Sequence, residues 1–430
     1  MTKRWTGLLM RTGPDREKQN ILWNMAGSFC YAFASMVLSF LVMGLAGEDE
    51  GGIFAFGYST FGQQMFILAY FGIRPFQITD GAEEYRFGDY LHHRYATCLL
   101  AAAAGAGYLM VSGYTPYKAA VIFLLVCWKT ADGFADVYES EFQRRGHLHL
   151  TGKSNTFRTI LSVGTFLAAL LRSKSLIWAC VAGVAAQAGG ILLFDILVAE
   201  RLPGVDFSWD KGRIRPLTAQ TLLLFVSVFL DFYIFSAAKY AIDTCMDDKA
   251  SGYFNIIFMP TSVINLAAGF VIRPVLTDLT GRWNRGQVRE FAGRLLGISR
   301  IIGALGLLAV VLAAGLGQPV LWVLEQVLGS GYEGSLTRYH IPFVLIIIGG
   351  VCYGFLNLHY YALVIMRRQK AIFGIYAALA LLAAVLAPAL VRREGIMGAA
   401  GAYLILMAVM AAAFAVGTWG GIRSARGGRR

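Results

Sequence analysis

Residues 71–80 read FGIRPFQITD, and residues 270–279 read FVIRPVLTDL. Both stretches close a long apolar run with Ile-Arg-Pro and continue within a few residues to Thr-Asp. Proline disfavours the helical backbone for the residue before it, so a helix tends to stop at that arginine. The repeated phrase therefore predicts two halves of similar layout, each with a second helix that ends at an arginine.

The composition is typical of a membrane protein. Of 430 residues, 57% are hydrophobic and 15% are charged, and the mean hydropathy is +0.57. Backbone polar groups cannot stay unpaired in lipid, so apolar runs of about twenty residues are expected to be helices. The sequence predicts an all-α integral membrane protein with about twelve transmembrane helices. We place them at residues 20–46, 53–73, 95–112, 117–138, 156–171, 175–198, 216–238, 252–272, 297–323, 341–366, 371–390 and 397–421.

The basic residues indicate the orientation of these helices. Most of the 38 lysines and arginines fall on the side of the termini, whereas acidic clusters such as Glu48, Asp49 and Glu50 fall on the other side. The positive-inside rule predicts that both termini are cytoplasmic. The net charge of +12 follows from this topology, and we expect no nucleic acid partner. The six cysteines form no CxxC pattern, so no metal site, disulfide framework or cofactor is predicted.

Two further pairs of matching features support a parallel repeat, in which each half of the chain contains six helices. Arg94 and Arg294 each follow an Ile-Arg-Pro by about twenty residues, and basic pairs end the predicted fourth and tenth helices at 144–145 and 367–368. The polar stretch 199–216, with two prolines, is a natural boundary. We predict an N-lobe over residues 1–203 and a C-lobe over residues 204–430, arranged around a central cavity.

Polar side chains recur at helical spacing on four predicted helices. Such stripes usually face a neighbouring helix or a water-filled cavity. Arginines at helix ends can also be interfacial anchors, and small hydroxyls can be packing contacts. The candidate substrate-binding residues at the cavity and its cytoplasmic mouth are Arg74, Arg273, Asn24, Gln63, Tyr70, Asn255 and Ser262.

Few ionisable residues fall inside the predicted helices. Lys129, Asp132 and Asp136 share one face of the fourth helix, where Lys129 and Asp132 can form a structural ion pair or contact substrate. Asp231 has no basic residue within one turn, so it must pair with another helix or with water. These four residues are the candidates for ion coupling. Asp195, which precedes a cytoplasmic loop, is expected at the membrane interface.

The pattern resembles the multidrug/oligosaccharidyl-lipid/polysaccharide exporter superfamily. The stretches ILWNMAGSFCYAFASMVLSF (21–40) and GIFAFGYSTFGQQMFILAYFGIRPFQITD (52–80) are similar to its polysaccharide-transporter branch, the lipid-linked oligosaccharide flippases. The resemblance implies two lobes that open alternately to each side of a bacterial cytoplasmic membrane. The implied cargo is an undecaprenyl-diphosphate-linked sugar, moved to the outer leaflet during envelope polysaccharide synthesis. Implied partners include a glycan polymerase or glycosyltransferases.

The residues fit this implication in part. Arginine has a planar fork suited to phosphate oxygens, so Arg74 and Arg273 are predicted to capture the diphosphate at the cytoplasmic mouth. Basic amphipathic loops, such as residues 278–300, are expected to contact anionic membrane lipids.

Two other functions compete with this one. An ion-coupled multidrug exporter of the same superfamily shares the architecture. Asp132 and Asp231 are carboxylates of the kind that such an exporter would use to bind the coupling ion. A membrane-embedded glycan polymerase or ligase would act on the same carriers, but the longest outer loop, near 324–340, is short for such an enzyme. The chain contains no HExxH, GxSxG or GxxxxGK motif, so we predict a transporter without enzymatic activity.

Overall fold

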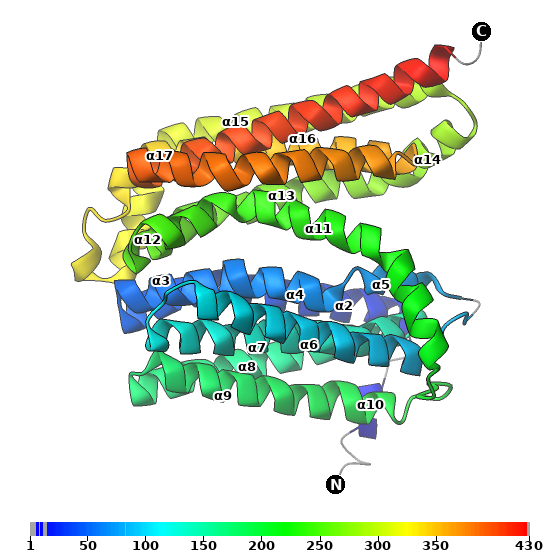
Figure 1. The fold of residues 1–430 in the computed structure, drawn as a ribbon, viewed down its shortest axis with the longest axis horizontal. Coiled ribbons are helices and arrows are strands. Elements are labelled where there is room, and N and C mark those ends of the chain that lie inside the picture. Colours follow the sequence, from blue (N-terminus) through cyan, green and yellow to red (C-terminus); the bar gives the residue numbers. More distant parts are fainter. Residues whose placement is uncertain (1–5, 8, 12–14, 82, 428–430) are drawn as a thin grey trace. The chain divides into compact units, whose positions relative to one another are not determined.

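The computed structural model describes residues 6–7, 9–11, 15–81 and 83–427, and every regular element in these ranges is helical. The chain divides into two compact units, residues 1–229 (unit 1) and 230–430 (unit 2). The division falls inside one long helix, α11, whose first half packs in unit 1 and whose second half packs in unit 2 (Figure 1). The lobe boundary predicted at residues 203 and 204 stays a prediction.

Unit 1 consists of long helices joined by short turns (Figure 1). Two of these helical runs contain a π-helical turn. The elements are α2 (Arg16–Ala46), α3 (Glu48–Phe56), the π turn η1 (Gly57–Phe61), α4 (Gly62–Tyr70), α5 (Ile73–Thr79), α6 (Phe87–Val111), α7 (Pro116–Arg144), α8 (Leu148–Ser173), α9 (Leu176–Ile191), the π turn η2 (Leu192–Ile196), α10 (Leu197–Ala199) and the first half of α11 (Lys211–Cys245).

Unit 2 is built in the same manner. Its last element, α17, is two helices joined at Gly395, whose φ of 57° and ψ of −131° interrupt the helical backbone. The elements are the second half of α11, α12 (Asp248–Phe258), α13 (Pro260–Ile272), the 3-10 turn η3 (Arg273–Val275), α14 (Leu276–Asn284), α15 (Val288–Leu328), the 3-10 turns η4 (Ser330–Tyr332) and η5 (Thr337–Tyr339), α16 (His340–Ile365) and α17 (Gln369–Gly427).

In the part of the chain that the structure describes, twelve long helical segments correspond to the twelve predicted ones. Within the described ranges, eight helices are long and apolar enough to cross a membrane. The four other segments are α7, α8, the α3–η1–α4 run and the second part of α17. Helix α7 is less apolar than these eight because it carries many charged residues, yet it is 29 residues long and mostly buried. Helix α7 can span a membrane only if its charged side chains are paired with groups of opposite charge.

The two Ile-Arg-Pro phrases occupy the same local position in their units. In unit 1, Phe71 and Gly72 adopt left-handed backbone conformations after α4, and Ile73 then begins the short helix α5. In unit 2, α13 ends at Ile272, and Arg273 begins a 3-10 turn that leads into α14. Each phrase thus lies where one helix gives way to the next. The prediction that the helix ends at the arginine holds approximately in unit 2, where α13 ends one residue before Arg273, and it is wrong in unit 1, because the break lies at Phe71 and Gly72 and Arg74 is part of α5.

Helices α2 and α8 pack closely because glycines face each other at their crossing. A Cβ atom on Gly152 would lie 2.1 Å from the carbonyl oxygen of Trp23, and one on Gly27 would lie 2.6 Å from the carbonyl oxygen of Gly152. Small residues let helix backbones approach in a membrane, where apolar side chains gain little by leaving lipid. This contact fixes the first helix of unit 1 against its fifth long segment.

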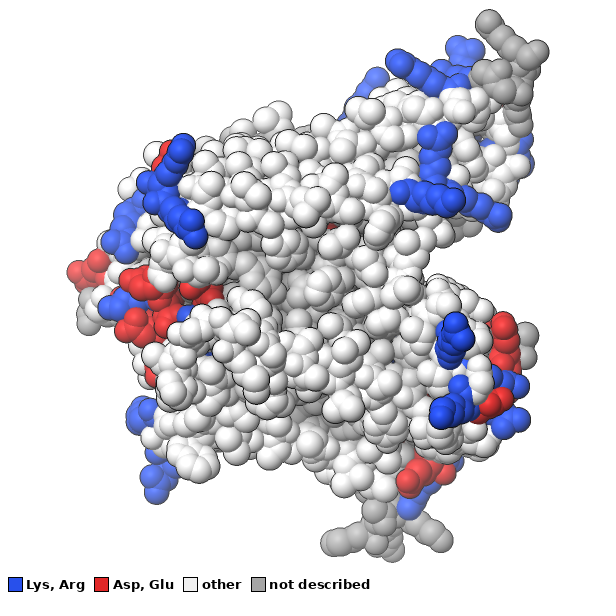
Figure 2. Space-filling view, in the orientation of Figure 1, with Lys and Arg blue, Asp and Glu red and all other residues white. Residues whose placement is uncertain are grey.

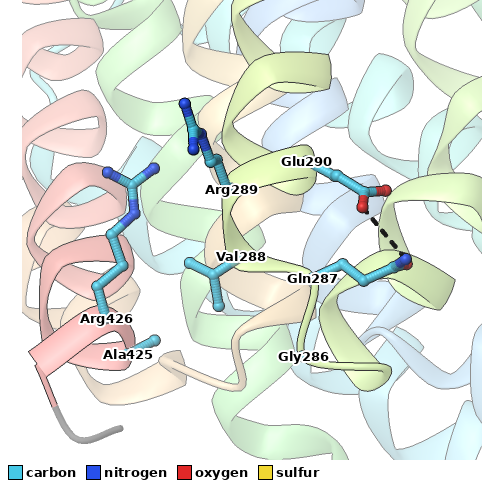
Figure 3. A pocket seen from close by; sticks show the side chains of 7 residues that line it. All are labelled: Gly286, Gln287, Val288, Arg289, Glu290, Ala425 and Arg426. Carbon is cyan, nitrogen blue, oxygen red and sulfur yellow. Dashed lines mark hydrogen bonds between the residues drawn. The ribbon is translucent and has the colours of Figure 1, made fainter. Parts of the chain in front are cut away.

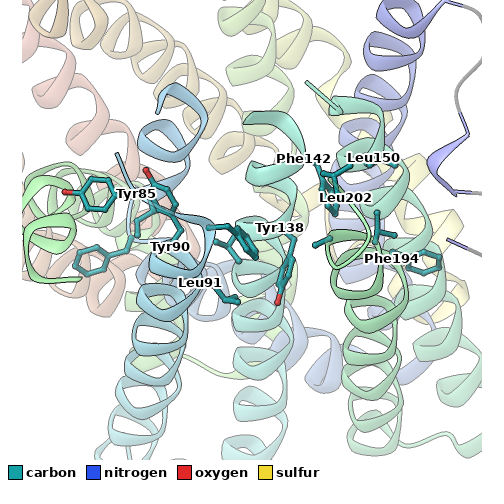
Figure 4. Packing of buried hydrophobic residues seen from close by; sticks show 14 of the residues in the cluster. Tyr85, Tyr90, Leu91, Tyr138, Phe142, Leu150, Phe194 and Leu202 are labelled. Carbon is teal, nitrogen blue, oxygen red and sulfur yellow. The ribbon is translucent and has the colours of Figure 1, made fainter. Parts of the chain in front are cut away.

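A cluster of buried aromatic and aliphatic residues fills one end of unit 1 (Figure 4). Tyr138 and Phe142 of α7 lie at its centre, with Tyr90 of α6 and Phe194 of η2 among their neighbours in the cluster. The ring of Phe71 stacks on that of Phe225, with centroids 4.2 Å apart, which holds the first half of α11 to this cluster. The cluster surrounds the end of α7 that carries most of its acidic residues.

Glu325 holds the predicted outer loop of unit 2. Its side chain is buried near the end of α15 and accepts backbone N–H groups from Leu336 at 2.6 Å, Thr337 at 2.7 Å and Gly334 at 3.1 Å. The hydroxyl of Thr337 donates a further hydrogen bond at 3.1 Å. One carboxylate therefore accepts hydrogen bonds from three backbone N–H groups of the loop between α15 and α16.

We expect Glu325→Ala to destabilise unit 2 by about 3 kcal/mol or more, because hydrogen bonds to a charged group contribute about 1.5–3 kcal/mol each and buried donors would be left unpaired. The melting temperature of the purified chain in detergent measures this effect. Glu333→Ala removes an exposed carboxylate of the same loop and should leave the melting temperature nearly unchanged. Equal melting temperatures for the two variants would refute the anchoring role.

Candidate functional site

Four charged residues in the middle of α7, which are Lys129, Asp132, Asp136 and Glu139, lie in two groups within unit 1. In the first group, Lys129 donates a hydrogen bond to the hydroxyl of Tyr31 at 3.0 Å, and Tyr31 donates one to Asp132 at 3.1 Å. Lys129 and Asp132 also form an ion pair at 3.9 Å. The amide of Gln187 on α9 donates to the other oxygen of Asp132 at 2.6 Å. The ion pair expected from their spacing is present, and both charges have neutral polar partners as well.

The second group centres on Asp136, which lies between two arginines. Arg74 forms an ion pair with one of its oxygens, and Arg94 of α6 pairs with the other at 3.2 Å. Arg74 also lies 3.5 Å from Glu139 and donates to the side-chain oxygen of Gln143 at 3.1 Å. The side chain of Arg94 has no exposed surface, whereas that of Arg74 is 25% exposed. Arg74 is thus held by two carboxylates and one amide.

Arg158 of α8 continues the series from Glu139. It pairs with Glu139 at 2.6 Å and with Asp195 at 2.8 Å, and all three side chains are buried. Ser154 donates to Asp195 at 2.5 Å. Asp195, which was expected at the membrane interface, is fully buried inside unit 1, where η2 packs against α8.

Together these contacts form an alternating series of charges: Arg94, Asp136, Arg74, Glu139, Arg158 and Asp195, which we call the charge chain. Its three arginines and three carboxylates compensate one another, which a buried set of charges requires. Its members come from α5, α6, α7, α8 and η2, so the charge chain ties these elements together. Such a series of ion pairs can hold helices together, or its carboxylates can bind a proton or a cation during transport.

Both π turns of unit 1 supply a partner to a charged residue. Tyr58 of η1 presents its ring 3.8 Å from the ammonium of Lys129. Asp195 of η2 pairs with Arg158. A π turn inserts one residue into a helix, changes which side chains face inward and is frequent at functional sites. In this protein the insertions bring an aromatic ring and a carboxylate to the two groups of charges.

Unit 2 has a different polar interior. Asp231 of α11 accepts a hydrogen bond from the hydroxyl of Tyr353 on α16 at 2.8 Å, and no lysine or arginine in the described ranges pairs with it. This agrees with the expectation that Asp231 pairs with another helix. Lys239 donates to the side-chain oxygen of Asn255 at 3.1 Å. Asp231 and Lys239 are thus each held by a neutral polar partner inside unit 2.

A cavity of about 300 Å³ opens in unit 2 between α13 and α16. Ser262, Asn265, Asn357 and Tyr361 supply its polar groups, and we call it the amide pocket. Asn357 donates to Asn265 at 2.8 Å across the two helices. The remaining lining residues are apolar or glycine, so no charged side chain lines the cavity.

The structure brings some of the predicted site residues together. Arg74 meets Asp136, and Lys129 meets Asp132. Ser262 lines the amide pocket. Asn24 and Gln63 lie half-buried on α2 and α4, the ring of Tyr70 faces Arg94 at 5.7 Å, and Asn255 is buried against Lys239. For Arg273 only the backbone, in η3, belongs to the described structure.

Sequence reasoning missed Asn265 and Asn357 of the amide pocket, and it missed Glu139, Arg158 and Asp195 of the charge chain. One signal was available: Asp132, Asp136 and Glu139 recur at spacings of four and three, which places all three carboxylates on one helix face. The buried partners of that face come from other helices, at separations that no local pattern reveals.

Comparison with known proteins identifies the fold. No family model matches the chain, and no curated protein matches it. Solved structures of MATE transporters do match over nearly the whole chain. The eukaryotic MATE transporter AtDTX14 aligns with a TM-score of 0.66 at 13% identity, covering 99% of both chains. A mutant of the Vibrio cholerae MATE transporter VcmN aligns with a TM-score of 0.62 at 13% identity, covering 98% of both chains.

A third structure, an inward-facing multidrug resistance MATE family transporter of the MOP superfamily, aligns with a TM-score of 0.58 at 12% identity and covers 99% of both chains. At these identities the likeness concerns the fold. The predicted fold class is confirmed: the chain is an all-α, multi-pass membrane protein of two lobes with the fold of MATE transporters.

The charge chain predicts that Arg74 contributes to stability. We expect Arg74→Gln to cost about 2 kcal/mol, below the 3–5 kcal/mol typical of a fully buried pair, because Arg74 is partly exposed and its carboxylates keep Arg94 and Arg158. Arg158→Gln should reach the full range. Melting temperatures in detergent measure both, with Arg172→Gln, an exposed arginine at the end of α8, as control. An Arg74→Gln variant as stable as the control would leave Arg74 free for the predicted capture of a phosphate.

Proposed function

We propose that the protein is a transporter that flips a lipid-linked oligosaccharide from the cytoplasmic to the outer leaflet by alternating access. The fold supports a membrane transporter, since the structures that match it over nearly their whole length are transporters. The amide pocket is the observation that carries the proposal for a sugar-bearing cargo.

The chemistry of the amide pocket suits sugar hydroxyls. Side-chain amides and hydroxyls both donate and accept hydrogen bonds, as sugar hydroxyls do. Asn265 and Asn357 hold each other in place at 2.8 Å, which preorganises their remaining donors and acceptors. Phe270 and Leu266 line the same cavity and are 68% and 54% exposed, so they offer apolar surface to the carbon faces of a sugar ring. A small neutral site with a few convergent polar groups is the common form of a ligand pocket.

The carrier diphosphate needs cationic partners. Arg273 directly follows α13, the helix that carries Ser262 and Asn265 of the amide pocket. We therefore retain Arg273 as the proposed ligand of the diphosphate. Arg74 is a weaker candidate, because a diphosphate would have to compete with Asp136 and Glu139 for its guanidinium.

An ion-coupled multidrug exporter is the second candidate function. One of the matching structures is a multidrug resistance transporter, and unit 2 contains a carboxylate, Asp231, with no cationic partner among the described residues. A carboxylate inside a membrane is costly, and such residues commonly carry protons or ions. Asp132 is compensated by Lys129 and is therefore less suited to bind a further cation.

The first test of this function concerns cargo. We expect Asn265→Ala and Asn357→Ala each to weaken binding of a lipid-linked oligosaccharide about five- to tenfold, since each lost hydrogen bond contributes about 1 kcal/mol. Binding of a fluorescent undecaprenyl-diphosphate oligosaccharide to the purified chain measures the loss. Asn284→Ala, an exposed asparagine of α14, is the matched control. Unchanged oligosaccharide binding with transport of a cationic dye would favour the exporter.

The second test concerns energy coupling. If transport consumes a proton or sodium gradient, Asp231→Asn should abolish the gradient dependence, while Asp132→Asn should reduce it less because Lys129 already neutralises that carboxylate. Transport into proteoliposomes with and without an imposed gradient measures this. Asp49→Asn removes an exposed carboxylate of a predicted outer turn and should transport as the parent does. If both Asp231→Asn and Asp132→Asn keep full gradient dependence, the two residues have structural roles only.

A further inference from the structure

One end of unit 2, where α15 begins and α17 ends, is strongly basic. Figure 2 shows lysines and arginines over this end of α14 to α17, with no acidic residue among them on the visible face. The stretches 276–300, 365–371 and 422–426 contain two acidic residues, Asp278 and Glu290. Their basic residues are Arg282, Arg285, Arg289, Arg294, Arg300, Arg367, Arg368, Lys370, Arg423 and Arg426.

Both acidic residues of this end are already paired. Arg282 donates to Asp278 at 2.9 Å and to Glu290 at 2.7 Å, and Arg294 lies 3.5 Å from Asp278. The hydrogen bond from Arg282 lowers the pKa of Asp278, so this carboxylate stays charged and keeps its partners. Four charged residues of α14 and α15 are thereby paired with one another. The positive charge nearer to α17 is not neutralised by them.

A cavity of about 660 Å³ lies between the start of α15 and the end of α17. Arg289 and Arg426 line it from the two helices, and Val288 and Ala425 supply apolar surface (Figure 3). Glu290 and Gln287 also belong to its lining, but their side chains extend to the opposite side of α15 in Figure 3, where they hydrogen-bond to each other at 3.3 Å. We call this cavity the basic pocket.

We propose that the basic pocket binds the phosphate headgroup of an anionic membrane lipid. Two guanidinium groups from different helices match phosphate oxygens in charge and in hydrogen-bond geometry. Basic pockets between transmembrane helices at the cytoplasmic surface are suited to anionic headgroups. The acyl chains of such a lipid could pack against exposed apolar side chains of α15, because Leu296, Ile301 and Leu305 lie exposed beyond its first turns.

The position of the pocket supports a lipid over a soluble anion. Helix α15 is one of the eight helices long and apolar enough to cross a membrane. The proposal takes its charged first turn, which precedes the apolar part of the helix, to lie at the level of the headgroups. The pocket is therefore open to a molecule whose phosphate sits at the membrane surface. The proposal goes beyond the transport function, since it requires only that unit 2 spans a membrane and not that the cargo is a lipid-linked sugar.

Lipid binding to the purified full chain tests the proposal. We expect phosphatidylglycerol to bind in detergent micelles more tightly than phosphatidylcholine. The double substitution Arg289→Gln with Arg426→Gln should weaken phosphatidylglycerol binding by roughly twentyfold, about fivefold for each arginine near the surface. The matched control, Arg392→Gln with Arg393→Gln, removes two exposed arginines near the kink of α17. Equal losses in the two double variants would overturn the site.

Two further measurements separate charge from folding and lipid from free phosphate. Glu290→Gln removes an acid of the pocket lining and releases Arg282 from it, so it should tighten phosphatidylglycerol binding roughly fivefold. Weaker or unchanged binding by Glu290→Gln would contradict an electrostatic site. Inorganic diphosphate should displace the lipid poorly. Displacement as complete as that by unlabelled phosphatidylglycerol would overturn the lipid assignment in favour of a free phosphate site.

Discussion

The compensation of buried charge on α7 is the interaction on which unit 1 depends. This helix carries Lys129, Asp132, Asp136 and Glu139 through the interior of the unit. A charge taken out of water costs several kcal/mol unless a partner is placed beside it, and removing one partner leaves the other uncompensated. The charge chain supplies these partners from α5, α6, α8 and η2, so the positions of five elements are coupled through one series of ion pairs. The glycine contact between α2 and α8 and the aromatic cluster around Tyr138 add packing to this electrostatic arrangement.

The two units share a helix plan but differ in how they hold polar groups. Unit 1 pairs Arg74, Arg94, Arg158 and Lys129 with carboxylates. Unit 2 holds Asp231 and Lys239 through a tyrosine and an asparagine, and it contains the amide pocket and the basic pocket. Because ion pairs between several helices resist rearrangement more than single neutral hydrogen bonds do, unit 2 is the better candidate for ligand binding. This difference directs the cargo and lipid experiments to residues of unit 2.

The candidate site could be predicted from sequence only where the signal was local. The shared face of Lys129, Asp132 and Asp136 follows from their spacing, and so does the need of Asp231 for a partner on another helix. Ser262, one of the predicted substrate-binding residues, lines the amide pocket, but its Asn357 side comes from α16, about ninety residues away in sequence. The proximity of Asp195 to a loop gave no sign of its burial or of its partner. In the folded chain the π turn η2 directs Asp195 toward Arg158, which is 37 residues away in sequence.

The sequence by itself determined the membrane environment, the number of long helical segments and the two-part organisation. These follow from composition, from the length of apolar runs and from repeated turn signals, all of which act over a few residues. Only the tertiary structure decided which charges are neutralised and which cavities remain open. Arg74 appeared to be a free cation at a helix end, and the fold places Asp136 and Glu139 beside it. Electrostatic energy depends on distances between side chains of different helices, and helix packing sets these distances.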